Sequence, residues 1–313
     1  ATAEVSPYLN LQGLVLAGEA IMRSGTESQR ERFLRSTLRN DILWCQLFSE
    51  PGAGSDLAGL QSSAILDGDH FVLNGQKVWS SNAQLAQFGI LMARTDFEQP
   101  KHKGITFFLL DMTLDGVEVR PIKQMTGDSE FCEVLFSDVI VPSDAVLGDV
   151  NGGWSVMGVA LAFERGVMGG TNPAVPLLRH VRGWATDAPS PDGGNMIDDP
   201  LLRERIARTA IANQVSQLLT LRAAWIAATG GLPGLEGSMA KLYATDRYQQ
   251  AVGWFQQMAG ADGLLGFGTD GAAADGWIDY DARHSPVTTI YGGTTEINRN
   301  NVAERHLGLP RAR

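Results

Sequence analysis

Ser49-Glu50-Pro51-Gly52-Ala53-Gly54-Ser55-Asp56 is the stretch of this sequence on which the fold assignment rests. Within it, Pro51 stiffens a turn, and Gly52 and Gly54 let backbone N–H groups come close to a ligand, with serine hydroxyls beside them. Leu57 stands where a third glycine would complete a dinucleotide-binding fingerprint, and no βαβ pattern surrounds the stretch. The stretch is therefore not a Rossmann loop, and by itself it predicts either an ordinary loop or a ligand-binding one.

The residues around this loop have the pattern of a β-domain. Between residues 42 and 148, short alternating or apolar runs are separated by Asp-Gly, Asn-Gly and proline, which is typical of antiparallel strands joined by turns. These runs lie at residues 70–73, 88–93, 104–111, 116–119 and 133–136.

Helical patterns flank the predicted strands. Residues 9–39 are expected to form helices with a break at 24–26, and longer helices are expected at 154–182, 200–229, 237–264 and 295–306. Residues 184–199 contain too much proline, glycine and aspartate to continue a helix, so they predict a surface loop. The expected fold class is α+β: an N-terminal helical segment (1–41), a central antiparallel β-domain (42–150) and a C-terminal helix bundle (151–313).

Composition narrows the functional class. The chain has 313 residues and a formal charge of −10, which disfavours nucleic acid as a partner. It contains no apolar stretch near the roughly 20 residues that span a bilayer and no signal-peptide pattern, so a cytoplasmic location without a membrane span is expected. Cys45 and Cys132 have apolar neighbours and are expected to be buried thiols, and the scattered histidines make a metal site unlikely to be present.

Further blocks follow the glycine-rich loop in a fixed order, and together they resemble the acyl-CoA dehydrogenase family of flavoproteins from about residue 11 to residue 310. The resemblance implies FAD as cofactor, oxidation of an acyl-CoA thioester to the 2,3-enoyl-CoA, and transfer of the electrons to an electron-transfer flavoprotein. That family normally begins with a longer helical domain, which here starts late. The blocks are Asn74-Gly75-Gln76-Lys77-Val78-Trp79-Ser80-Ser81-Asn82, Phe136-Ser137-Asp138-Val139-Ile140-Val141-Pro142, Phe163-Glu164-Arg165-Gly166, Ile290-Tyr291-Gly292-Gly293-Thr294-Thr295-Glu296-Ile297-Asn298-Arg299 and Ala303-Glu304-Arg305.

The catalytic base departs from the usual pattern of that family. Many members carry a glutamate directly after the tyrosine of the C-terminal loop, where this chain has Gly292, whereas another branch takes its base from the helix after the β-domain, where this chain offers Glu164. The helical neighbours of Glu164 are all apolar, so its carboxylate is expected to be buried, with the raised pKa that suits a base. The alternative is an ion pair with Arg165 or another cation. The neighbours are Met157, Ala160, Leu161, Val167 and Met168.

The resemblance also implies a set of flavin and substrate contacts. Trp79 would cover the edge of the flavin ring, although a strand tryptophan more commonly fills the core. Ser81 could donate a hydrogen bond toward the flavin N5 atom, Gly292 would offer its backbone N–H to the thioester carbonyl, and Arg165 would lie near substrate or coenzyme. The expected cofactor-binding residues of this part are Leu47, Ser49, Gly54, Ser55, Trp79, Ser80 and Ser81, and the expected substrate-binding residues are Ser55, Arg165 and Gly292.

The C-terminal part of the family contacts the flavin of a neighbouring subunit, which implies such roles for Gln257, Gly260, Thr294 and Glu296. Here Ala261 replaces the second glycine of one block, and an Arg-x-x-Phe-Gly run is absent, its place being taken by residues 182–184 and the following loop. Such departures resemble bacterial α2β2 members that act on steroid-derived CoA esters, as an alternative to a homotetramer. Two other functions stay open: a non-catalytic partner subunit, and an oxidase or flavin monooxygenase on the same fold.

Overall fold

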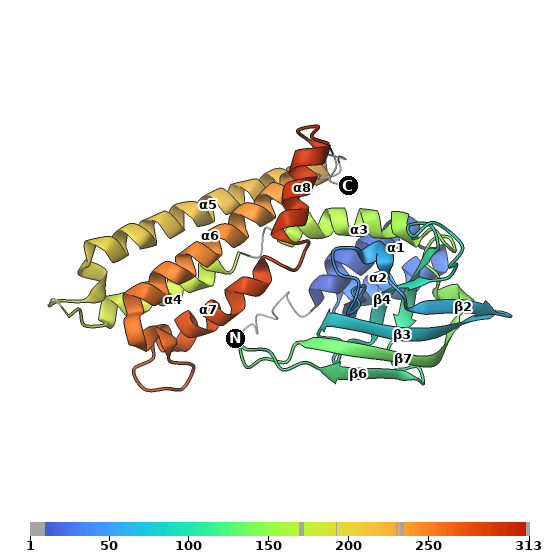
Figure 1. Ribbon diagram of the computed structural model, residues 1–313, viewed down its shortest axis with the longest axis horizontal. Helices are drawn as coiled ribbons and strands as arrows, with labels where there is room; N and C mark the ends of the chain where they lie inside the picture. The colour runs from blue at the N-terminus through green and yellow to red at the C-terminus, as the bar shows by residue number, and fades with distance from the viewer. Residues whose placement is uncertain (1–9, 169–171, 192, 230, 232–234, 311–313) are drawn as a thin grey trace. The chain divides into compact units, whose positions relative to one another are not determined.

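The computed structural model describes residues 10–168, 172–191, 193–229, 231 and 235–310. The chain divides into two compact units, Ala1–Phe163 and Glu164–Arg313, and each is treated by itself below. Figure 1 labels their helices and strands. The division into three sequence domains at residues 41 and 150 stays a proposal. Among the described residues, no helix combines the length and the apolar content that crossing a membrane requires.

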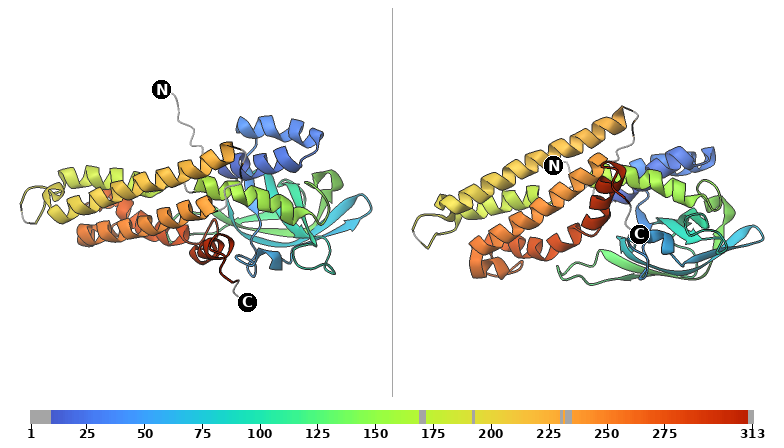
Figure 2. Two further views of the ribbon diagram at one scale, coloured as in Figure 1. Left: turned by 90° about the horizontal axis from the view of Figure 1, so that it is seen from above. Right: turned by 45° about the horizontal axis from the view of Figure 1, so that its top comes forward.

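The first unit begins with a π-helical turn, η2 (Gln12–Ala17), followed by α1 (Gly18–Ser24) and α2 (Glu27–Leu38). The predicted break between helices is confirmed. Thr26 caps α2 in a capping box, since its hydroxyl accepts from the Gln29 N–H at 3.2 Å while the Gln29 side chain accepts from the Thr26 N–H at 3.0 Å. Figure 2 shows α1 and α2 side by side along one face of the sheet.

The sheet has seven strands: β1 (Trp44–Leu47), β2 (Ser63–Asp67), β3 (His70–Ser81), β4 (Phe88–Arg94), β5 (Ile105–Asp111), β6 (Val117–Pro121) and β7 (Phe131–Pro142). All five predicted runs form strands, while β1 and β2 were not predicted. The predicted antiparallel β-domain is confirmed for most strand pairs, and the exception is β4, which pairs in parallel with β1 and, at one position, with β2. Between β1 and β4 the chain forms the antiparallel β2–β3 hairpin. It then enters β4 running in the same direction as β1 and β2, so these pairs are parallel.

Both faces of the central strands are buried, because successive side chains of a strand point to opposite faces. Along β4, Ile90 and Met92 join a core beneath α1 and α2, whereas Leu91 and Ala93 join a second core on the other face. The second core also holds the two free cysteines, Cys45 and Cys132, as the sequence predicted.

The second unit is helical. Its helices are α4 (Ala174–Asp187), α5 (Pro200–Ala228), α6 (Leu235–Ala259), α7 (Trp277–Thr288) and α8 (Thr295–Arg305), and α5 and α6 run side by side (Figure 1). The helix α3 (Gly153–Met168) spans the division between the units. The expected single helix at 154–182 is wrong: α3 ends at Met168 and α4 begins after Pro173, which disfavours helix at the residue before it. The helix α7 was not predicted.

A buried acid lies in the core of this second unit. Asp281 of α7 accepts a hydrogen bond from the hydroxyl of Tyr248, which is completely buried on α6. Burial raises the pKa of Asp281 to about 6, although the Tyr248 hydrogen bond acts in the opposite direction. The folded protein therefore holds this proton to a higher pH than the unfolded chain, whose aspartates titrate near pH 3.9.

We expect Asp281→Asn to remove a pH-dependent loss of stability. In the parent, the contribution of the protonated acid is complete below about pH 4 and is lost as the pH rises through about 6, by about 3 kcal/mol. The variant should match the parent in urea unfolding at pH 4 and exceed it at pH 8. Asp262→Asn, at an exposed aspartate, makes the same change of charge as a control. Equal effects of Asp281→Asn at both pH values would contradict this assignment.

Candidate cofactor and substrate site

The glycine-rich loop presents open backbone. Glu50 and Ala53 close a tight turn through two reciprocal backbone hydrogen bonds of 3.1 and 3.0 Å. Beyond this turn Gly54 and Ser55 are exposed, and a Cβ atom added at Gly52 or Gly54 would meet nothing within 4 Å. The backbone of this segment is therefore accessible to a ligand, and Ser49 at its start is half-buried.

Trp79 has a strained backbone and an exposed side chain. Its φ of 63° lies in the left-handed region, which a bulky residue rarely adopts, and it sits where the pairing of β3 with β7 shifts register between Lys77 and Ser80. Its side chain is 60% exposed and contacts Phe131 edge to face, with ring centroids 6.2 Å apart. The interpretation of Trp79 as a core residue is therefore wrong. Strain of this kind persists where function requires it.

The two serines after Trp79 differ in environment. Ser80 is buried, and its hydroxyl has no hydrogen-bond partner in the described part of the chain. Ser81 is half-buried at the end of β3. Because a buried hydroxyl without a partner costs free energy, Ser80 fits a site that is completed by a ligand.

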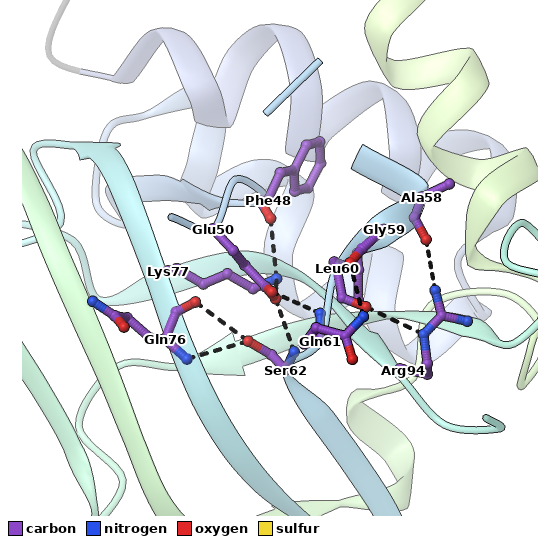
Figure 3. A network of polar contacts seen from close by, with 10 residues as sticks. All are labelled: Phe48, Glu50, Ala58, Gly59, Leu60, Gln61, Ser62, Gln76, Lys77 and Arg94. Carbon is purple, nitrogen blue, oxygen red and sulfur yellow. Dashed lines mark hydrogen bonds and ion pairs between the residues drawn. The ribbon is translucent and has the colours of Figure 1, made fainter. Parts of the chain in front are cut away.

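A buried ion pair lies beneath the glycine-rich loop (Figure 3). The Nζ atom of Lys77 donates to the carboxylate of Glu50 at 2.8 Å and to the carbonyl of Phe48 at 3.0 Å. Burial lowers the pKa of Lys77 to about 8, although Glu50 acts in the opposite direction. Burial alone would raise the pKa of Glu50, but Lys77 and the N–H groups of Gln61 and Ser62 outweigh it and lower that pKa.

Arg94 holds the inner part of the same loop. This arginine is 4% exposed and donates to the carbonyls of Ala58 at 2.7 Å and Leu60 at 3.2 Å, as Figure 3 shows. Hydrogen bonds from Arg94 therefore hold the Ala58–Leu60 part of the loop, while the backbone at Gly52 and Gly54 stays accessible. Sequence reasoning missed Glu50, Lys77 and Arg94 as parts of the site, although the first two lie within the quoted motifs.

The C-terminal loop of the second unit turns its carbonyl groups inward. Gly292 and Gly293 have φ values of 64° and 80°, which glycine adopts at no steric cost. The buried Lys241 donates to the Gly293 carbonyl at 2.8 Å, and the buried Asn298 donates to the carbonyls of Gly292, Gly293 and Thr294 at 3.4, 2.8 and 3.1 Å. Lys241 and Asn298 were also missed, because neither stands out in the sequence.

The N–H groups of this loop are left as donors. Within the described residues, the structure gives no acceptor for the N–H groups of Gly292, Gly293 and Thr294. Thr294 caps α8 by accepting from the Ile297 N–H at 3.2 Å. Glu296 is exposed in the first turn of α8, where a hydrogen bond from its own N–H, and then one from the Thr294 hydroxyl, lower its pKa. The loop thus presents donors, and its backbone can polarise a carbonyl oxygen.

Some predicted site residues are not brought together. Gln257 near the C-terminal end of α6 and Gly260 just beyond it are exposed. Gln257 is about 24 Å along the helix axis from Lys241 at 1.5 Å per residue, and hence far from the Gly293 loop that Lys241 binds. Leu47 is completely buried and exposes no atom to a ligand. Glu164 and Arg165 belong to α3, but their side chains lie outside the described residues.

Two family models match the chain. Residues 45–139 match the acyl-CoA dehydrogenase middle domain, and residues 151–307 match the acyl-CoA dehydrogenase C-terminal domain. The first covers most of the sheet, including the glycine-rich loop and Trp79, and the second covers the helical unit with the loop at Gly292.

Individual relatives agree with these matches. The chain is 42% identical to acyl-CoA dehydrogenase FadE34 of Mycobacterium tuberculosis, over 94% of this chain but only 39% of the length of FadE34. It is 36% identical to acyl-CoA dehydrogenase IpdE1 of the same organism, over 99% of this chain and 78% of IpdE1. Among solved structures it resembles the Tcur3481-Tcur3483 steroid ACAD, with a TM-score of 0.87 and 32% identity over 96% of this chain and 77% of that one.

Proposed function

This chain belongs to the acyl-CoA dehydrogenase family, and from that premise we propose that it oxidises an acyl-CoA thioester to the 2,3-enoyl-CoA and passes the electrons to an electron-transfer flavoprotein. Members of this family are FAD-dependent flavoproteins. The observation that carries the proposal is the end of β3, where the strained and exposed Trp79 precedes the unpartnered hydroxyl of Ser80.

The residues of the first unit fit a flavin. The open backbone at Gly54 and the hydroxyls of Ser49 and Ser55 would bind its polar groups, while Trp79, with Ser80 and Ser81, would lie against its ring system. When bound, FAD supplies the acceptor for the hydride that leaves the β-carbon of the substrate. The protein then has two remaining tasks, which are to polarise the thioester carbonyl and to accept the α-proton.

Polarisation of the thioester is assigned to the loop after α7. We propose that the N–H of Gly292 donates to the thioester carbonyl oxygen, because the described residues offer it no acceptor and Lys241 and Asn298 hold the loop that carries it. Ser55 and Arg165 are proposed to contact the substrate.

The proton acceptor is assigned to Glu164. The residues seven, four and three positions before it on α3 are Met157 and Ala160, which are buried, and Leu161, which is half-buried. An apolar surrounding of this kind raises the pKa of a carboxyl group toward the range in which it acts as a base.

Steroid-derived CoA esters are the substrate class that the comparisons favour. One solved structure that the chain resembles is the Tcur3481-Tcur3483 steroid ACAD. We therefore propose an α2β2 assembly with an unlike chain, with a homotetramer as the alternative. In such an assembly we propose that Gln257, Gly260, Thr294 and Glu296 contact the flavin of a neighbouring subunit. A cytoplasmic location stays a prediction.

An anaerobic visible spectrum, titrated with short, long and steroid-type acyl-CoA esters, tests the function and the substrate class together. Bleaching of the flavin band by one class would establish dehydrogenase chemistry and identify that class. A flavin-containing protein that no ester bleaches would contradict the proposal. A colourless chain would favour the second candidate, a non-catalytic partner subunit, which the replacement of a motif glycine by Ala261 also favours.

We expect Trp79→Asn to weaken flavin binding without unfolding the protein. Asparagine tolerates the left-handed backbone that strains tryptophan, so relief of strain offsets the lost contacts, and the free energy of unfolding should stay within about 1 kcal/mol of the parent. The Kd for FAD should rise about tenfold, the equivalent of one aromatic stacking contact. Trp79→Phe keeps an aromatic face and is the control. A loss of about 3 kcal/mol or more, as for a buried tryptophan, would contradict this assignment.

A further inference from the structure

We propose that Glu50 and Lys77 are positioning residues, which hold the glycine-rich loop in register with the Trp79–Ser81 end of β3 so that both contact one flavin. This inference rests on the proposed function, because it assigns the ion pair to the binding of FAD. Neither residue is itself assigned a contact with FAD or with the substrate.

One carboxylate closes the loop. The Oε2 atom of Glu50 accepts from the Gln61 N–H at 2.6 Å, and its Oε1 atom accepts from the Ser62 N–H at 2.9 Å. Glu50 lies at the start of the loop and the two donors lie at its end, so the carboxylate ties both ends together (Figure 3). The glycine-rich segment lies between these two ends, and its path depends on this closure.

The closed loop is bound to β3 at both ends. At its start, Lys77 donates to Phe48 and Glu50, and the Val78 N–H donates to the Ser49 carbonyl at 2.9 Å. At its end, the Ser62 hydroxyl accepts from the Gln76 N–H at 3.2 Å.

A glycine allows this close approach. A Cβ atom at Gly75 would lie 2.7 Å from the Cα atom of Ser62, so a larger residue there would push the end of the loop away from β3. The contacts of β3 with the loop run from Gly75 to Val78, the residue directly before Trp79. The loop is therefore anchored to β3 directly before the Trp79–Ser81 segment.

The burial of this ion pair indicates that it serves to position the loop rather than to stabilise the fold. Lys77 is completely buried and Glu50 is 8% exposed, so both charges lose their hydration. Burial lowers the pKa of Lys77, whereas the donors around Glu50 outweigh its burial and lower the pKa of that carboxyl group. An apolar or neutral pair of similar volume commonly stabilises a fold as well as a buried ion pair does. Such a pair would lack the hydrogen bonds that fix the loop to β3.

The test is the double variant Glu50→Gln/Lys77→Met, which removes both charges while keeping the volume. We expect its melting temperature to equal or exceed that of the parent, while the Kd for FAD rises about tenfold or more and the visible circular dichroism of bound FAD changes. Hydrogen exchange at the Gln61 and Ser62 amides should accelerate. A merely structural pair would move the melting temperature and leave the flavin signals unchanged.

A matched control uses an exposed pair that joins Asp56 of the loop to Lys101, which lies between β4 and β5. Lys101 donates to Asp56 at 2.7 Å, and both side chains are more than half exposed, so Asp56→Asn/Lys101→Met should leave the Kd for FAD unchanged. If the charge-neutral double variant does not fold, Glu50→Asp keeps the charge, shortens the carboxylate by one methylene and should still weaken FAD binding. An unchanged Kd and dichroism in either folded variant overturn the inference alone. A parent that binds no FAD overturns the proposed function as well.

Discussion

Glu164→Gln should leave FAD bound and lower the rate of flavin reduction by acyl-CoA by about 10³-fold, within the range that general-base catalysis contributes. Glutamine has nearly the same shape as glutamate but cannot accept the α-proton, so substrate binding should persist while the chemistry stops. The measurement is anaerobic stopped-flow reduction at saturating substrate, with the flavin content of each preparation taken from its visible spectrum.

A surface glutamate provides the control for this experiment. Glu204 on α5 pairs with Arg208 one helical turn away, and its side chain is half exposed. Glu204→Gln should therefore reduce flavin at the parent rate. Reduction of Glu164→Gln at that same rate would exclude Glu164 as the base and return attention to the other carboxylates of the chain.

Lys77→Met should lower the free energy of unfolding by about 3–5 kcal/mol, because it leaves the Glu50 carboxylate buried without its cation. Denaturant unfolding of the FAD-free protein measures this loss without a contribution from ligand binding. The double variant with Glu50→Gln should recover all of it, since the remaining charge is then removed as well.

The matched control for Lys77→Met is Lys101→Met, which breaks an exposed pair with Asp56. Exposed pairs contribute about 1 kcal/mol or less, so this variant should unfold close to the parent. A loss of less than about 1 kcal/mol in Lys77→Met would mean that water or a neighbouring donor takes over the carboxylate of Glu50.

Hydrophobic patterning was sufficient for most of the fold. Strands such as β4 and β5 were predicted because they are continuous apolar runs bounded by turn residues. The helix α7 was missed because it carries several charged residues and Pro286 within a short span. The first helix after the β-domain was predicted to be too long, because apolar periodicity resumes beyond Pro173 and the sequence pattern therefore shows no break there.

The site was predicted only where its residues belong to contiguous motifs. Trp79 and Ser80 could be found in this way, but the left-handed backbone of one and the unpartnered hydroxyl of the other cannot be read from a sequence. Lys77 meets Glu50 from 27 positions away and Lys241 meets Gly293 from 52 positions away. Tertiary structure alone creates such partnerships, because no local pattern records which buried cation will face which oxygen.

The support of the loop after α7 bears on how enzymes of this kind diverge. Among the described residues, the side chains of Lys241 and Asn298 donate to backbone carbonyl oxygens of this loop, and none of these hydrogen bonds involves a side chain at Gly292. The support of the loop therefore needs no side chain at that position, where the φ of 64° itself favours glycine. On the proposed assignment, the proton acceptor can therefore lie on a different segment from the backbone donor of the thioester, and a change in the position of one does not require a change in the other.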